Sequence, residues 1–177
     1  IPTEVRYPYV ARVAAIQAGL PMDSEAMAVN RLCSSGLQGI VTTAQNILLN
    51  DCDYGIGGGV EVMSRGAYLS PQMRSGARMG DAKMIDSMVA TLTDPFGVGH
   101  MGITAEEVAT RYGVSRVDQD AFAAESQRRA AAAIASGAFK AEIVAVPIPQ
   151  KKGDPVPFDT DEYPRAGSTA QTLAGLK

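Results

Sequence analysis

Residues 26–40 have the sequence Ala26-Met-Ala-Val-Asn-Arg-Leu-Cys-Ser-Ser-Gly-Leu-Gln-Gly-Ile40, and they indicate how the first part of the chain is built. The segment up to Asn30 is short and mainly apolar, as buried strands are. After Cys33, apolar side chains recur at helical spacing and predict a helix with one buried face; they are Leu37, Ile40, Val41, Ala44, Ile47 and Leu48. Residues 54–60 are a second candidate strand, whose glycines suggest that another backbone packs closely against it. This order predicts a right-handed, parallel βαβ unit.

The segments on either side of this unit are less regular. Upstream, we predict a helix that starts near Pro8, because proline suits a first helical turn, and that Gly19 and Pro21 end. Downstream, residues 65–102 are rich in Gly, Met, Ser and Arg, and they favour only a short helix near residues 81–91.

Two further helices are predicted from their end signals. Thr104 with Glu107 is typical of a capping box, which begins a helix that runs to about Tyr112. Ser115 is expected to begin a long, alanine-rich helix, which Gly137 ends.

The last third of the chain predicts little sheet. Residues 142–148 alternate as a strand does, residues 149–165 hold four prolines and are expected to be mostly loop, and residues 168–176 favour one short helix. Two core strands are too few for a stable sheet, which usually needs about four or more. We therefore expect an α/β fold that something outside this chain completes.

Composition excludes several classes of function. The 177 residues are 46% hydrophobic and 20% charged, with 16 Lys and Arg against 19 Asp and Glu, so the chain lacks the basic excess of a nucleic-acid binder. No apolar run is long enough to span a membrane, and no signal peptide is recognisable. Two cysteines and one histidine exclude a disulfide scaffold and a zinc cage, so we expect no metal and a reducing, cytoplasmic location.

Cys33 is the strongest candidate for chemistry. It lies at a strand-to-helix turn, where the positive end of the helix favours a thiolate and the small residues that follow let a substrate approach. A hydrolase presents its nucleophile on a similar elbow. The alternative is a small buried cysteine that packs a helix terminus, and the residues alone leave both possibilities open.

The other candidate motifs carry weaker signals. Cys52 has no basic or helix-initiating neighbour and is interpreted as structural. His100 lies between glycines in a loop, without a carboxylate or second histidine in register, so an exposed loop histidine remains the alternative to a ligand contact. The glycines of residues 55–59 do not match a dinucleotide fingerprint, because Val60 occupies its third glycine position.

At this point the residues resemble a known family. Val29-Asn-Arg-Leu-Cys-Ser-Ser-Gly-Leu-Gln-Gly-Ile40 is similar to the acyl-enzyme signature of the thiolases, the acyl-CoA C-acyltransferases. The resemblance covers essentially the whole chain, and the other matching stretches follow in the family's order. These stretches are Ile56-Gly-Gly-Gly-Val-Glu-Val-Met-Ser-Arg65, Gly80-Asp81, His100-Met-Gly-Ile-Thr-Ala-Glu106 and Phe158-Asp-Thr-Asp-Glu-Tyr163.

The resemblance assigns roles to five residues. Cys33 matches the cysteine that takes the acyl group as a thioester. His100 and Met101 match the pair that lines the pantetheine and acyl pocket. Leu92 and Arg165 match positions that contact coenzyme A, the arginine near the nucleotide end.

The resemblance also implies the architecture. The fold is expected to be thiolase-like, with an incomplete N-terminal βαβ core in residues 1–64 and an inserted, mainly helical loop domain in residues 65–177. Thiolases are about twice as long as this chain. Their second half carries an Asn-Glu-Ala-Phe segment, a Gly-His-Pro histidine and a second catalytic cysteine in Cys-x-Gly-Gly-Gly, none of which occurs here.

The implied reaction is acyl transfer between coenzyme A thioesters, as 3-ketoacyl-CoA thiolysis or acetoacetyl-CoA formation. No cofactor beyond these substrates is expected, and the chain alone is expected to be inactive in turnover. The alternatives are a non-catalytic fragment, or a subunit of a split enzyme that acts as a coenzyme A-binding module. The expected partners are acyl-CoA and coenzyme A, together with further copies of the chain or a companion chain that completes the fold.

Overall fold

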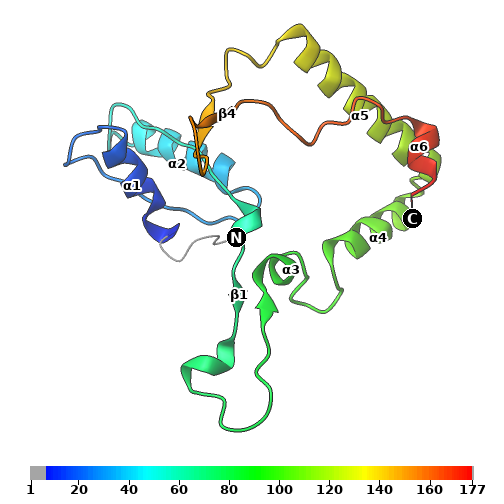
Figure 1. Ribbon diagram of the computed structural model, residues 1–177, viewed down its shortest axis with the longest axis horizontal. Coiled ribbons are helices and arrows are strands. Elements are labelled where there is room, and N and C mark those ends of the chain that lie inside the picture. Colours follow the sequence, from blue (N-terminus) through cyan, green and yellow to red (C-terminus); the bar gives the residue numbers. More distant parts are fainter. Residues whose placement is uncertain (1–6, 177) are drawn as a thin grey trace. The chain divides into compact units, whose positions relative to one another are not determined.

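A computed structural model describes residues 7–176, in two units that are described separately (Figure 1). The first unit extends to Ile103 and the second begins at Thr104. Residues 1–6 of the predicted core lie outside the described residues. The predicted division into a core of residues 1–64 and a loop domain of residues 65–177 stays a prediction.

The first unit holds the two helices that the sequence predicts around the candidate nucleophile. In chain order its elements are η1 (Tyr7–Tyr9), α1 (Val10–Gln17), α2 (Ser35–Leu48), η2 (Met63–Arg65), β1 (Tyr68–Leu69), η3 (Pro71–Arg74), β2 (Ile85–Asp86) and α3 (Ser87–Thr91). Helix α1 ends before Gly19, as expected, where φ is +87°. Helix α2 coincides with the predicted apolar stripe.

The predicted parallel strands are not formed within the described residues. Residues 26–30 and 54–60 have no regular secondary structure and no ladder joins them. A strand is stabilised by a ladder of hydrogen bonds to its neighbours, and among residues 7–176 neither segment belongs to such a ladder. The glycine-rich segment instead lies against α2, which confirms the close backbone approach that the glycines predicted.

The irregular region contains a small hairpin that the sequence pattern did not predict. Strands β1 and β2 pair antiparallel, with Tyr68 opposite Asp86 and Leu69 opposite Ile85. Asp86 then caps α3, because its carboxylate accepts from the N–H groups of Met88 and Val89. Helix α3 therefore begins later than the predicted residue 81.

Helix α4 (Met101–Tyr112) spans the boundary between the units and begins earlier than predicted. The capping box at Thr104 is wrong, since this residue lies inside the helix. The start is set instead by Leu92, whose carbonyl accepts from the N–H of Met101 at 2.9 Å.

The second unit is organised by α5 (Arg116–Ser136), followed by β3 (Val146–Ile148), β4 (Val156–Phe158) and α6 (Ala170–Ala174). Both predicted end signals of α5 are confirmed: Ser115 caps its first turn, and Gly137 has φ +73°. Strands β3 and β4 pair antiparallel, so part of the predicted loop at residues 149–165 is a strand.

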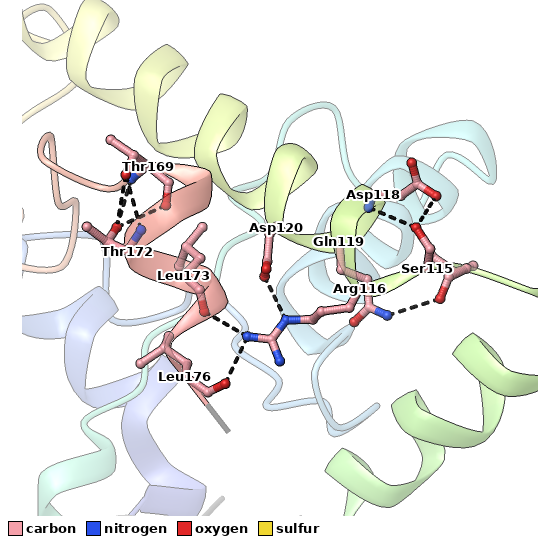
Figure 2. A network of polar contacts seen from close by, with 10 residues as sticks. Ser115, Arg116, Asp118, Gln119, Asp120, Thr169, Thr172, Leu173 and Leu176 are labelled. Carbon is pink, nitrogen blue, oxygen red and sulfur yellow. Dashed lines mark hydrogen bonds and ion pairs between the residues drawn. The ribbon is translucent and has the colours of Figure 1, made fainter.

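A polar network joins the start of α5 to the end of α6 (Figure 2). The Arg116 guanidinium pairs with Asp120 at 2.9 Å. It also donates to the carbonyl groups of Leu173 and Leu176 at 2.7 and 3.0 Å. The Leu173 carbonyl also accepts from the N–H of Leu176 at 2.9 Å, so the arginine adds a charged donor to a helix end that is already bonded. The arginine thus fixes α6 to α5.

Apolar burial is nearly absent in the part of the chain that the structure describes. Within it no hydrophobic residue is buried, and Ser87 is the one buried residue. On the stripe of α2, Leu37 is 65% exposed and Leu48 is 81% exposed. Apolar surface of this kind is normally removed from water on folding.

Candidate active site

Cys33 stands immediately before α2, with its side chain exposed. The first N–H groups of a helix have no intrahelical acceptor. The N-cap residue Ser34 makes no side-chain capping bond. Within the described residues, the N–H groups of Gly36 and Leu37 have no acceptor at all. Cys33 is therefore one residue before the N-cap of a helix whose first turn has free N–H donors among the described residues.

The backbone directly before the cysteine is strained. Leu32 has φ +50°, in the left-handed region that a leucine rarely adopts. This conformation costs about 1–2 kcal/mol for a residue with a Cβ. Asn30 supports it, because its Oδ1 accepts from the N–H of Leu32 at 2.9 Å. Such strain is characteristic of functional turns that the surrounding structure holds in place.

Ser35 closes the turn from the other side. Its Oγ donates to the carbonyl of Leu32 at 2.6 Å and accepts from the N–H of Arg31 at 2.9 Å. The guanidinium of Arg31 donates to Gln38 at 2.8 Å, which adds a second link to α2. The elbow is thus tied to the helix that follows it.

Close glycine contacts fix α2 along its length. A Cβ on Gly57 would lie 2.8 Å from the carbonyl oxygen of Gly39 and from Ile40 backbone atoms. A Cβ on Gly59 would lie 3.1 Å from Gly36. Helix α2 and residues 57–59 therefore make direct backbone contacts, and these contacts begin three residues after Cys33.

A second group of predicted site residues forms a closed loop between α3 and α4. The N–H of Met101 donates to the Leu92 carbonyl, and the backbones of His100 and Thr93 form an isolated antiparallel β-bridge. Leu92 is half-buried, whereas His100 and Met101 are exposed. The Nδ1 of His100 accepts from the N–H of Gly102 at 3.1 Å. With Nδ1 acting as an acceptor, Nε2 is left to contact a ligand.

Arg165 lies in the second unit and its side chain is exposed. Its N–H donates to Oε1 of Gln127, on α5, at 2.7 Å. Next to it is a shallow hollow of about 310 Å³, lined by α5 and the segment before the arginine. The lining residues are Ser126, Gln127, Ala130, Asp161, Glu162, Tyr163 and Pro164.

The structure thus brings Leu92, His100 and Met101 together. Among the described residues no hydrogen bond links Cys33 to that loop, and Arg165 belongs to the other unit. Sequence reasoning missed the role of Gln127 at the arginine. Nothing in an alanine-rich helix marks one glutamine as a long-range partner.

The described residues show neither a metal-binding group nor a membrane-crossing helix. No cluster of three or more His, Cys, Asp or Glu side chains is found among residues 7–176. In the same range, every helix is too short or too polar to cross a bilayer.

Comparison with known proteins places these observations in context. The family described as "Thiolase, N-terminal domain" matches residues 4–177. The Beta-ketothiolase BktB of Cupriavidus necator is 53% identical over 177 residues, all of this chain and 45% of that protein.

Two solved structures show the same fold. The acetyl-CoA acetyltransferase of Bacillus anthracis is 40% identical, with a TM-score of 0.89 over 94% of this chain and 42% of that one. Human mitochondrial 3-ketoacyl-CoA thiolase in complex with CoA is 32% identical, with a TM-score of 0.91 over 99% of this chain and 43% of that one. The chain therefore has a partial thiolase-like α/β fold, and it spans less than half the length of these relatives.

Proposed function

The chain belongs to the thiolase family, and from that premise we propose that Cys33 accepts an acyl group from a coenzyme A thioester. One observation carries the proposal: Cys33 is exposed and precedes the N-cap of α2, whose first turn holds the N–H groups of Gly36 and Leu37 without an acceptor among the described residues. Backbone donors placed in this way stabilise the negative oxygen that forms when a thioester is attacked.

The chemical step follows from this geometry. The Cys33 thiolate attacks the thioester carbonyl carbon, and a new S–C bond forms. The tetrahedral adduct then collapses as its bond to the coenzyme A sulfur breaks. Coenzyme A leaves as a thiolate that takes up a proton, and the acyl group stays on Cys33 as a thioester.

The same proposal gives binding roles to the residues around the loop and the hollow. A backbone hydrogen bond holds Met101 to Leu92, and beside it Nε2 of His100 is available to a pantetheine or acyl oxygen. Arg165 carries a positive charge suited to the phosphates of the nucleotide end. The solved human relative is titled as a complex with CoA, which supports this ligand class.

Full turnover requires more than these residues supply. The second step, carbon–carbon bond making or breaking, needs a base and further oxyanion donors. The one histidine of the chain is bonded through Nδ1 to its own helix. We therefore propose that residues 1–177 alone do not turn over. The alternative is that these residues are a non-catalytic part of a larger assembly and bind coenzyme A.

The other expectations remain proposals. They are that no cofactor acts beyond the coenzyme A thioesters, that the location is cytoplasmic, and that further copies or a companion chain cover the exposed apolar face of α2.

Intact-mass measurement after incubation with acetyl-CoA tests the acyl-enzyme directly. We expect one acetyl adduct that hydroxylamine removes, absent from Cys33→Ala. Cys52→Ala is the matched control, since it removes the other cysteine and is expected to keep the adduct. An adduct that persists in Cys33→Ala would refute the assignment. Coenzyme A binding without any adduct would instead favour the binding module.

A further inference from the structure

The left-handed backbone at Leu32 raises the question of what holds it. The chain has two non-glycine residues with positive φ among those described, Leu32 at +50° and Asn50 at +60°. Asparagine adopts this region readily, because its short polar side chain forms local hydrogen bonds. Leucine has no such means. Neighbouring groups must hold Leu32 in this conformation, and they do so one residue before the sulfur.

Ser35 is the residue that reaches both sides of this turn. Its hydroxyl donates to the Leu32 carbonyl and accepts from the Arg31 N–H, at 2.6 and 2.9 Å. It therefore pairs a donor and an acceptor that flank the strained residue. Asn30 supplies only one bond, to the Leu32 N–H.

The same arrangement keeps the start of α2 open. A serine near a helix start usually accepts from a backbone N–H of the first turn. Here the Ser35 hydroxyl turns back to residues 31 and 32, and Ser34 makes no capping bond. The N–H groups of Gly36 and Leu37 consequently remain available beside the sulfur.

We propose that Ser35 is a positioning residue, which locks Leu32 in the left-handed conformation and so fixes the Cys33 sulfur in front of the helix donors. The inference rests on the proposed acyl transfer to Cys33. It concerns placement, because Ser35 touches the backbone and not the reacting sulfur. A displacement of about 1 Å at a reacting group can lower a rate by about 100-fold.

The test compares variants of the full-length protein that contains these residues. The measured quantities are the rate constant of Cys33 acetylation at saturating acetyl-CoA, the half-saturating concentration and the rate of alkylation by iodoacetamide. Ser35→Ala removes both bonds of the hydroxyl and keeps the backbone bond from the Ser35 N–H to the Leu32 carbonyl, whereas Ser35→Thr keeps the hydroxyl. Ser136→Ala is the matched control, because the Ser136 hydroxyl likewise donates to the backbone carbonyl three residues earlier, at 3.0 Å, but at the end of α5.

We expect Ser35→Ala to lower the acetylation rate constant at least tenfold, with the half-saturating concentration unchanged within twofold. Ser35→Thr and Ser136→Ala are expected to stay within threefold of the unaltered protein. Alkylation by iodoacetamide, which needs no fixed approach, is expected to fall less than threefold in Ser35→Ala.

An unchanged acetylation rate in Ser35→Ala would overturn the inference. So would an equal loss in alkylation, which would show altered sulfur reactivity rather than placement. Ser35→Gly serves if Ser35→Ala does not fold; it removes the same two hydroxyl bonds, and an unchanged acetylation rate in it would count equally against the inference. Absence of any acetyl adduct in the unaltered protein would refute the proposed function itself, and this inference with it.

Discussion

Gly57→Ala is expected to damage both stability and the site, because the glycine-rich segment and α2 meet without room for a side chain. The new Cβ would lie 2.8 Å from three backbone atoms, the oxygen of Gly39 and the N and Cα of Ile40, where ordinary contact begins at 3.4 Å. Backbone atoms cannot rotate away as side chains do, so the two segments must separate by about 0.6 Å. Overpacking of this kind costs about 1–3 kcal/mol.

The matched control is Gly58→Ala, one residue along. Its Cβ would meet nothing within 4 Å among the described residues, and its φ is not in the left-handed region. This substitution is expected to cost nothing, or to add up to about 1 kcal/mol by reducing the freedom of the unfolded chain. The two alanines therefore separate packing from the general effect of losing a glycine.

Urea unfolding, followed by circular dichroism, measures the difference. With a denaturant slope of about 2 kcal/mol per molar, a loss of about 2 kcal/mol moves the midpoint down by about 1 M. Acetylation of Cys33 is expected to slow in Gly57→Ala alone, because the displaced helix carries its donors away from the sulfur. Equal midpoints for the two alanines would refute the packing argument.

Two further predictions concern the second unit. Arg116→Ala removes the donors that hold the end of α6. The free energy of local opening of α6 is therefore expected to fall by about 1–2 kcal/mol, which makes amide exchange in α6 faster while exchange in α5 is unchanged. Equal protection of α6 in the variant and the unaltered protein would contradict this. Arg128 and Arg129 lower the pKa of Glu125 to about 2, so the ion pairs stabilise α5 fully above about pH 5, and this contribution is lost as the pH falls through 2. Glu125→Gln is expected to abolish that dependence in a circular dichroism titration of the helix, and a carboxyl that titrates near its ordinary value by NMR would refute the assignment.

Helices were predicted well because their signals are local. The stripe of α2, the serine cap and the closing glycine of α5 each depend on residues within a few positions of one another. The error at α4 has a local cause of another kind. Thr104 and Glu107 have the right spacing for a capping box, but the Leu92 carbonyl accepts from Met101 and starts the helix three residues earlier.

Strands were predicted poorly because a strand depends on its neighbours. Residues 26–30 and 54–60 have the composition of buried strands, yet neither belongs to a sheet in the part of the chain that the structure describes. Conversely, Val156–Phe158 contains a proline and sits in a proline-rich stretch, which argues against a strand. It pairs all the same with Val146–Ile148, which confirms the end of the strand predicted at residues 142–148, and the pairing of the two segments leaves no mark in the second one alone.

The residues of the candidate site also differ in whether local or distant contacts hold them. The elbow at Cys33 is held by bonds between residues no more than seven positions apart, all of them between residues 30 and 38. The Arg165 segment depends on Gln127, 38 positions away, and the apolar face of α2 has no cover among the described residues. Nucleophile placement is therefore the most self-contained part of the proposed chemistry. Substrate binding and turnover are the parts that depend on how the remaining surface is covered. Acetylation of Cys33 is accordingly expected to survive perturbations of the second unit that abolish the proposed coenzyme A contacts near Arg165.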